Sequence, residues 1–330
     1  NPQYYNFVIE LLILSLDKNL VYRSLNFLKP VLQEITSRPD LLNKTDSEDF
    51  KNRIDGLFSR VQPFIIENNE TNLNLRKTIF KVCYFLGLDN SINQILRYEN
   101  DENLFLYMLD VIYQNPRRSV AGGLIKASAN FDSDMILRKI SSTMIKIIEQ
   151  DPALNPFIFV LENSIWTNPN FLLASYYIIY ETNNYDYLKS FSNTYKSINE
   201  DKKINQILYK MFQSFLIKVK DEKKIQDITS FILDFEKVRP IFYPVLLEKE
   251  IEINNKIVVI ELLKEKECSD CVDILIKLAF TEIKADNAKL NNLDSTLLIK
   301  LNIAIIDAIS RLGNSSSFTQ LLPIAEYYHD

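Results

Sequence analysis

Residues 295–328 contain the pattern that most constrains the fold. Apolar side chains recur there at the three-and-four spacing of one helical face, at Leu298, Leu301, Ile305, Ala308, Ile309 and Leu312. We expect Gly313 to end this helix, because the residue after the last helical turn often takes a positive φ, which glycine adopts freely. A shorter apolar segment follows at 318–328. Because such a helix–glycine–helix unit cannot cover its own apolar face, the pattern predicts a stack of similar units.

The composition favours helices over strands. Only five of the 330 residues are glycine, whereas 47% are hydrophobic. Hairpins, phosphate loops and strand-to-helix crossovers rely on glycine, so its scarcity favours short turns between helices. The predicted fold class is therefore all-α. A stack also accommodates this length, because each unit packs only on its neighbours and the core grows lengthwise.

Further copies of the helical pattern precede the last one. We expect helices at 73–86, 90–97, 102–114, 133–149, 169–182, 202–219, 254–266 and 295–312. The repeats would end at Gly87, Asn115, Gln150, Asn183, Lys220, Glu267 and Gly313, in steps of 28 to 47 residues. Insertions in the turns explain such variation in degenerate helical arrays. Residues 1–70, with helices expected at 4–16, 21–36 and 48–68, would form an N-terminal helical cap region. This region would continue into the array at 71–330 as one elongated domain.

The repeated unit resembles a HEAT repeat, an armadillo-like helical hairpin. The match is best at Ala308-Ile-Ser-Arg-Leu-Gly313 and is similar at Val82-Cys-Tyr-Phe-Leu-Gly87. The resemblance covers residues 70–330. Tetratricopeptide repeats are the alternative at this period, but the alanines do not recur at the fixed offset that their helix crossings need. The HEAT resemblance implies a right-handed superhelix of stacked antiparallel hairpins, with the second helix of each repeat lining a concave face.

A protein-binding surface is the first functional hypothesis. In the arrangement that the resemblance implies, the positions opposite the apolar stripes form the concave face: Lys77, Lys81, Tyr84, Tyr107, Asp110, Arg138, Ser142, Lys210, Lys300 and Asp307. Exposed tyrosine and arginine are good anchors for protein contacts. The chain would then be a non-catalytic scaffold or adaptor that binds a protein or peptide.

The segment Asn115-Pro-Arg-Arg-Ser-Val-Ala-Gly-Gly123 supplies a second hypothesis. Arg117 and Arg118, together with exposed N–H groups at a helix start, could hold a phosphate or carboxylate. The chain would then be a regulatory or anion-binding subunit of a larger enzyme or envelope complex. The segment lacks the Lys-Ser/Thr of a phosphate loop, so it does not indicate nucleotide hydrolysis. The structural alternative is a turn between repeats whose small residues let helices pack closely.

Catalytic and metal chemistry have little support in the sequence. Cys268 and Cys271 form a C-x-x-C motif. Acidic neighbours would raise the pKa values of both thiols, which disfavours a redox pair. A zinc site would need two more ligands, and the only other nitrogen or sulfur ligands are the distant Cys83 and His329. We interpret the pair as ordinary half-buried cysteines. The sole histidine, His329, lies at the frayed end of the chain, which disfavours a catalytic triad. We therefore expect no enzyme, no cofactor and no metal.

Two groups of residues have plain structural interpretations. The acidic starts of Glu200-Asp-Lys-Lys203 and Asp221-Glu-Lys-Lys224, and the pairs Asp132/Asp134 and Glu48/Asp49, are interpreted as helix starts. Residues 152–180 hold one charged side chain, Glu162, and the only tryptophan, Trp166. This stretch is interpreted as the buried middle of the array, with an exposed apolar patch for a partner as the alternative.

Charge and hydropathy bear on partners and location. The net charge is −5, and neither half of the chain has the basic excess of a nucleic-acid binder, so nucleic acid is not expected. The apolar run at 7–16 is too short to span a membrane. The start at Asn1-Pro2 suggests a piece of a longer protein. We expect a cytoplasmic location, or an envelope-associated one if a signal or lipid anchor precedes this piece. The oligomeric state does not follow from the sequence.

Overall fold

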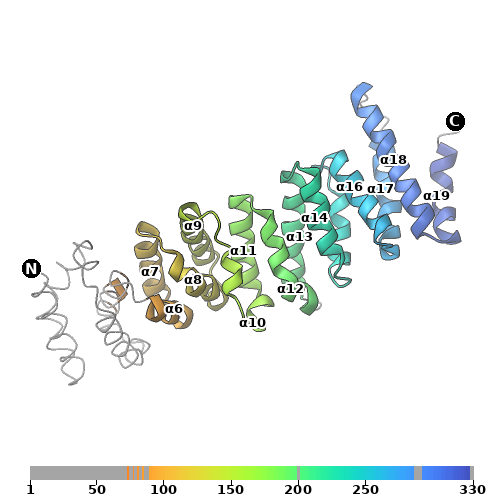
Figure 1. Ribbon diagram of the computed structural model, residues 1–330. Helices are drawn as coiled ribbons and strands as arrows, with labels where there is room; N and C mark the ends of the chain where they lie inside the picture. Colours follow the sequence, from red (N-terminus) through yellow and green to blue (C-terminus); the bar gives the residue numbers. More distant parts are fainter. Residues whose placement is uncertain are drawn as a thin grey trace, which may run out of the picture. The chain divides into compact units, whose positions relative to one another are not determined.

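The computed structural model describes residues 89–198, 201–285 and 292–327, together with positions 73, 77, 80, 81 and 84. These residues form helices joined by short turns, with no strand among them (Figure 1), which confirms the all-α fold class. The chain divides into two compact units: unit 1, Asn1–Ile165, and unit 2, Trp166–Asp330. The expected cap boundary near residue 70 and the expected helices before it lie outside the described residues. No described helix has both the length and the apolar character needed to cross a membrane.

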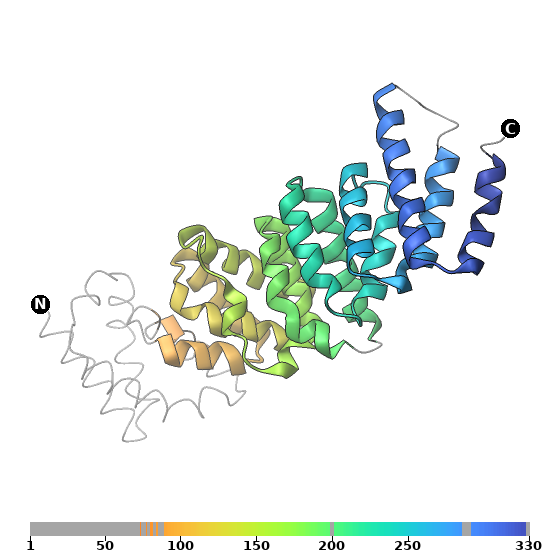
Figure 2. The same cartoon turned by 45° about the vertical axis from the view of Figure 1, so that its right-hand side comes forward.

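Unit 1 holds two layers of helices. Its elements are α6 (Asp89–Tyr98), α7 (Glu102–Gln114), η2 (Arg118–Val120), α8 (Ala121–Ala127), η3 (Ser128–Asn130), α9 (Asp134–Gln150), η4 (Pro156–Phe159) and the short α10 (Asn163–Trp166) at the unit boundary, where η marks a 3-10 helix. α7 packs on α9 in one layer, and α8 packs on α6 and η4 in the other (Figure 2). The five described positions of the expected 73–86 helix are all helical.

Local sequence signals account for the helix starts of unit 1. The Asp101 carboxylate accepts a hydrogen bond from the Leu104 N–H at 3.0 Å and caps α7. Asp134 stands in the first turn of α9, where a negative charge favours the positive end of the helix dipole. The helices expected at 90–97, 102–114 and 133–149 are therefore confirmed. The sequence indicated a helix start within 115–123 but not the extent of α8, because a seven-residue helix that contains Gly122 and Gly123 has little helical propensity.

Unit 2 also holds two layers. Its elements are α11 (Pro169–Thr182), η5 (Tyr185–Phe191), α12 (Ser192–Ser197), α13 (Lys202–Lys218), α14 (Glu222–Leu233), α15 (Arg239–Phe242), η6 (Tyr243–Leu247), α16 (Ile253–Glu265), η7 (Ser269–Cys271), α17 (Val272–Ala285), α18 (Asn292–Leu312) and α19 (Ser315–Tyr327). In one layer α11 packs on α13, α13 on α15 and η6, η6 on α17, and α17 on α19. In the other, η5 packs on α14, α14 on α16, and α16 on α18.

The layers correct the expected repeat assignment. The helices at 202–219, 254–266 and 295–312 exist, but α13 lies in one layer of unit 2 whereas α16 and α18 lie in the other. They are therefore not equivalent copies. The position after α13 in its own layer is filled by α15 and η6, which contain Pro240 and Pro244. Proline interrupts helices. Because residues 239–247 show no long helical period, the next copy of the pattern was assigned to the helix that follows them in the chain, α16, which belongs to the other layer.

Helix ends also depart from the expected chemistry. Asn183 and Glu267 end two expected repeats and take the left-handed conformation, each with φ 52°. Gly313 does follow α18, but its φ lies outside the left-handed region, so the reason given for it was wrong. A Cβ at Gly313 would instead lie 2.6 Å from the Ile309 carbonyl oxygen and 3.0 Å from the Ser317 Cβ. Close approach of backbone and side chain therefore requires glycine here.

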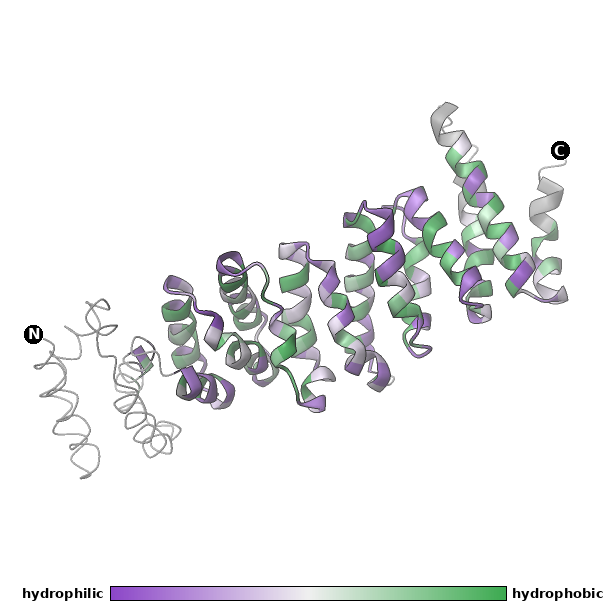
Figure 3. Cartoon of the chain, viewed as in Figure 1, coloured by the Kyte–Doolittle hydropathy of each residue, from purple (hydrophilic) through white to green (hydrophobic). Residues whose placement is uncertain are grey.

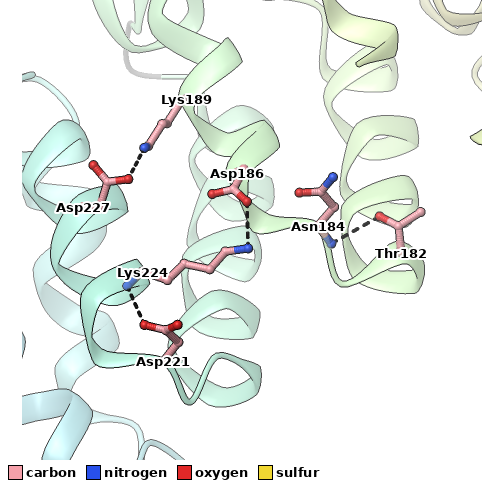
Figure 4. Close-up of polar contacts among 7 residues, drawn as sticks. All are labelled: Thr182, Asn184, Asp186, Lys189, Asp221, Lys224 and Asp227. Carbon is pink, nitrogen blue, oxygen red and sulfur yellow. Dashed lines mark hydrogen bonds and ion pairs between the residues drawn. The ribbon is translucent and has the colours of Figure 1, made fainter. Parts of the chain in front are cut away.

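Ion pairs connect neighbouring elements of unit 2. Lys189 of η5 pairs with Asp227 of α14, and Asp186 of η5 accepts from Lys224 of α14 at 2.8 Å (Figure 4). Asp221 caps α14 by accepting the Lys224 N–H at 3.0 Å, which confirms its interpretation as a helix start. Exposed pairs of this kind contribute about 1 kcal/mol or less each. They therefore set the register of η5 on α14 more than they stabilise the fold.

The 152–180 stretch is partly buried and partly exposed. The Trp166 side chain is 3% exposed, and its ring lies 5.3 Å from those of Phe171 and Phe191, edge-on to both. The interpretation of Trp166 as core is therefore confirmed. Ile158 and Leu161, however, are 57% and 81% exposed. The stretch as a whole is thus not buried; Ile158 and Leu161 belong to unit 1, and Tyr180, which is 38% exposed, belongs to unit 2.

Candidate functional site

The proposed concave residues of unit 1 lie on the 73–84 positions, α7 and α9, but they do not form a uniformly exposed surface. Tyr84 is fully buried, and its hydroxyl donates to the Asn115 carbonyl oxygen, so its prediction as an exposed anchor was wrong. The Lys77 ammonium lies 5.3 Å from the Tyr107 ring centroid, and burial raises the pKa of the Tyr107 hydroxyl. Lys81 is half-buried.

The remaining unit 1 positions pair with their neighbours. Asp110 of α7 pairs with Lys139 of α9 at 2.8 Å. Arg138 pairs with Asp134 one helical turn earlier, also at 2.8 Å. Ser142 donates its hydroxyl to the Lys139 carbonyl oxygen at 3.0 Å. These side chains therefore form ion pairs and a hydrogen bond on the surface of α7 and α9.

The proposed residues of unit 2 do not share one layer. Lys210 belongs to α13, whereas Lys300 and Asp307 belong to α18 in the other layer. Asp307 pairs with Lys264 of α16 at 2.6 Å, so it connects two helices. A single binding face through these three residues is therefore not supported within unit 2. The correction follows from the change of layer described above.

Lys210 lines a groove of about 820 Å³ in unit 2. The lining residues are Lys202, Asn205, Gln206, Tyr209, Lys210, Gln213, Pro240, Ile241 and Pro244. The Tyr209 hydroxyl donates to Glu248. Two lysines are the only charged residues among those lining the groove, so its electrostatic preference for a ligand is modest.

A larger groove, of about 950 Å³, lies in unit 1. It is formed by α6, α8, the turn before α8 and the end of α9. Its charged lining residues are Arg97, Arg117, Arg118, Lys126 and Asp151. Four cations thus face one carboxylate, and Glu162 beside the groove adds a second. In a chain with a net charge of −5, this is a local excess of positive charge. We call it the cationic groove.

The two predicted arginines contribute differently to the cationic groove. The Arg117 guanidinium donates to the Tyr84 carbonyl oxygen at 2.5 Å and lies 4.6 Å from the Tyr84 ring centroid. No carboxylate of the described residues lies within ion-pair distance of Arg117. Arg118 pairs with Asp151 at 2.8 Å, and its side chain remains 61% exposed. Arg117 is therefore also a packing residue, whereas Arg118 is accessible to a ligand.

Small residues let α8 approach α6 closely. The Gly123 N–H donates to the Asn93 Oδ1 at 2.7 Å, and the Asn93 Nδ2 donates to the Ser119 carbonyl oxygen at 2.8 Å. A Cβ at Gly123 would lie 2.5 to 2.9 Å from Asn93 atoms. The alternative of a closely packed turn is therefore correct. The expected exposed N–H group is not found at Gly123, because Asn93 already accepts its proton.

Glu162 joins two cations of the groove. Its carboxylate lies 3.2 Å from the Arg97 Nη2 and 3.3 Å from the Lys126 Nζ. Burial raises the pKa of the Glu162 carboxyl. The hydrogen bonds from its own backbone N–H and from Lys126, with the charges of Lys126 and Arg97, outweigh this effect and hold the pKa below its ordinary value. Glu162 is therefore ionised at neutral pH.

Sequence reasoning missed Arg97 and Lys126. They come from α6 and α8, and Glu162 follows η4, so no local motif unites the three residues. One signal was available: Arg97 and Lys126 are 29 residues apart, close to the first expected repeat step of 28. Equivalent positions of successive repeats lie side by side when the repeats stack.

The two described cysteines are buried completely. Burial raises the pKa of the Cys271 thiol to about 12 and raises that of Cys268 as well. Both thiols are thus protonated at neutral pH and are poor nucleophiles. Cys83 and His329 lie outside the described residues, and no cluster of three or more His, Cys, Asp or Glu side chains within the described ranges is arranged to hold a metal ion.

The raised thiol pKa predicts alkaline destabilisation. An unfolded thiol loses its proton near pH 9, whereas Cys271 in the fold keeps it until about pH 12. The stability due to this thiol is therefore complete below pH 9 and is lost as the pH rises from 9 towards 12. At pH 10 the loss should be about 1–2 kcal/mol. Urea unfolding at pH 8 and pH 10 measures it, and the Cys271→Ala variant should show a smaller drop; equal drops in both proteins would contradict the assignment.

α18 carries an exposed apolar stripe in unit 2. Ile299, Ile303 and Ile306 are 58%, 61% and 53% exposed and follow the three-and-four spacing of one helical face. Figure 3, coloured by hydropathy, shows apolar and polar residues interspersed along the same helix. Leu301 and Ile305 are buried on the opposite side of the helix. Apolar stripes of this kind favour contact with another protein surface.

Comparison with known proteins gives no relative from which a function could be transferred. No family model matches the chain, and neither curated proteins nor solved structures gave a significant match.

Proposed function

We propose that this chain is a non-catalytic interaction protein whose cationic groove binds an acidic segment of a partner protein. One observation carries the proposal: Arg97, Arg117, Arg118 and Lys126 line a single groove in a chain of net negative charge. Guanidinium and ammonium groups form their strongest hydrogen bonds with carboxylates and phosphates. The groove therefore favours an anionic ligand.

The size and lining of the groove favour a peptide over a small anion. A volume of about 950 Å³ is at the upper end for ligand sites and far exceeds one phosphate or carboxylate. The lining also offers apolar area from Phe159 and from Tyr98, which is 50% exposed. Aromatic and arginine side chains together are typical anchors of protein contacts. An acidic peptide that also carries apolar side chains would use both kinds of lining residue.

We propose further that the helices form a HEAT-like array of hairpins that serves as a scaffold. The two packed layers within each unit support this proposal. The exposed apolar stripe on α18 supports a protein as the partner. The alternative of a regulatory subunit that binds a free anion uses the same arginines, so the test below includes inorganic phosphate.

Binding of a fluorescein-labelled decaglutamate peptide, followed by fluorescence anisotropy, tests the proposal. We expect saturable binding at 50 mM salt that weakens strongly at 500 mM, because salt screens charge pairs. The Arg118→Gln variant should bind about five- to tenfold more weakly, since it loses one charge-assisted contact.

Arg138→Gln is the matched control. Arg118 and Arg138 both pair with an aspartate at 2.8 Å, and both side chains are 61% exposed, but only Arg118 lines the groove. The control should bind decaglutamate as the unmodified protein does. No binding at low salt, or an equal loss in both variants, would refute the proposal. Competition by millimolar phosphate as effective as that by unlabelled decaglutamate would favour the free-anion alternative.

A further inference from the structure

We infer that Arg97 and Lys126 form the subsite for a ligand carboxylate, and that Glu162 occupies this subsite in the free protein and is displaced by the ligand. This inference rests on the proposed function, because it concerns the same cationic groove. It names the chemical group that the ligand must carry and the residue that limits the affinity for it.

The position of Glu162 shows that the subsite accepts a carboxylate. Arg97 comes from α6 and Lys126 from α8, so the two cations lie on adjacent helices of one layer. The Glu162 Oε1 lies 3.2 Å from the Arg97 Nη2 and accepts a hydrogen bond from the Lys126 Nζ at 3.3 Å. The Glu162 Oε2 lies 3.3 Å from the same Nζ. One carboxylate thus reaches both cations at once. A glutamate or aspartate side chain of a peptide has the same planar pair of oxygens and fits the same cations.

The Glu162 contacts are longer than those of a well-formed pair. Charge-assisted N–H···O bonds usually measure about 2.7–2.9 Å. The Arg118–Asp151 pair in the same groove measures 2.8 Å, whereas both Glu162 contacts exceed 3.1 Å. The buried Glu162 Oε2 lies 3.3 Å from the Lys126 Nζ but accepts no hydrogen bond from the described residues. A free ligand can adjust its position and form shorter, stronger hydrogen bonds to Arg97 and Lys126 than Glu162 forms. A ligand carboxylate is therefore expected to displace Glu162 and not Asp151.

The segment that carries Glu162 leaves it room to move. Glu162 lies between η4 and α10, and the preceding Leu161 is 81% exposed. The Glu162 side chain itself is 30% exposed, so a path to solvent exists. Rotation about its side-chain bonds is enough to leave the two cations. Displacement therefore requires no rearrangement of the helices.

The Glu162→Gln variant tests the inference with the same decaglutamate peptide. Glutamine has the same shape but no charge, so it competes poorly for Arg97 and Lys126. We expect the affinity for decaglutamate to rise about five- to tenfold. Adding Lys126→Gln to the Glu162→Gln protein should remove this gain. Urea unfolding of each variant shows whether it is folded at the assay temperature.

Asp110→Asn is the matched control, because Asp110 pairs with Lys139 at 2.8 Å in unit 1 and does not line the groove. It changes the net charge by the same amount and should leave the affinity unchanged. If the unmodified protein binds decaglutamate but Glu162→Gln binds equally or more weakly, the inference fails and the proposed function stands. If neither the unmodified protein nor the Glu162→Gln variant binds decaglutamate, the inference and the proposed function both fail. If Glu162→Gln gains affinity only for inorganic phosphate, the carboxylate assignment is overturned.

Discussion

The Phe212→Ala variant should lose about 3–5 kcal/mol of unfolding free energy, measured by urea denaturation. Phe212 of α13 is fully buried, and its ring lies 5.4 Å from the Phe242 ring in an edge-on contact and 6.1 Å from the Tyr195 ring. Truncation to alanine removes the buried ring and leaves a cavity that the surrounding aromatic side chains fill only partly. Because Phe242 belongs to α15, the cavity would weaken the contact at which the helical period of the sequence is interrupted.

Phe318→Ala is the control for this prediction. Phe318 of α19 belongs to the same unit, but its side chain is 46% exposed. Its truncation should cost about 1 kcal/mol or less, because little apolar area is removed from the core. If both variants lose equal stability, Phe212 does not occupy the packed position described above.

The Gly123→Ala variant should lose about 3 kcal/mol, the upper end of the range for overpacking. The new Cβ would lie 2.5 Å from the Asn93 Oδ1, 2.7 Å from the Asn93 Cα and 2.9 Å from the Asn93 carbonyl oxygen. Two of these atoms belong to the backbone of α6, so a side-chain rotation cannot relieve the contact. α8 must move away from α6, which also lengthens the hydrogen bond from the Gly123 N–H to Asn93.

The adjacent Gly122→Ala variant is the control. The nearest atoms to its Cβ would be the Phe159 Cβ, Cγ and Cδ1, at 3.2, 3.3 and 3.8 Å, so a shift of a few tenths of an ångström relieves the contact. Alanine also favours the helix over glycine by up to about 1 kcal/mol. The net change should therefore stay within about 1 kcal/mol of zero. Equal losses in the two variants would show that helix α8, and not its approach to α6, determines the effect.

Particular residues show how far the sequence could predict the fold. The helix capped by Asp101 and the one that begins at Asp134 were expected, because caps and apolar periodicity are local signals. Gly123 was expected to allow close packing, and it does. Gly313 was expected to end a helix, but through its φ and not through the crowding that the structure shows. Local signals thus predicted where these helices lie, but they did not predict the contacts that require glycine at a helix end.

The sequence predicted only some of the residues of the candidate site. Arg117 and Arg118 stood out as neighbours in a turn, whereas Arg97, Lys126 and Glu162 are spread over 65 residues. Tyr84 was placed on a binding face although it is buried against Asn115. A helical wheel shows which side of one helix is polar, but it does not show which neighbouring segment covers that side.

The sequence by itself determined the all-α class and the bounds of α6, α7, α9, α11, α13 and α16 to within one residue, because apolar periodicity within a helix depends on residues close in the chain. It did not predict α17, nor more of α14 than its start. Tertiary structure alone decided which helices share a layer and which charges share a groove. α13 and α16 carry similar patterns but lie in different layers: the proline-containing α15 and η6 follow α13 in its own layer, whereas α16 packs on α14 and α18 in the other. Packing joins residues that are 29 to 65 positions apart, and no local rule encodes such contacts.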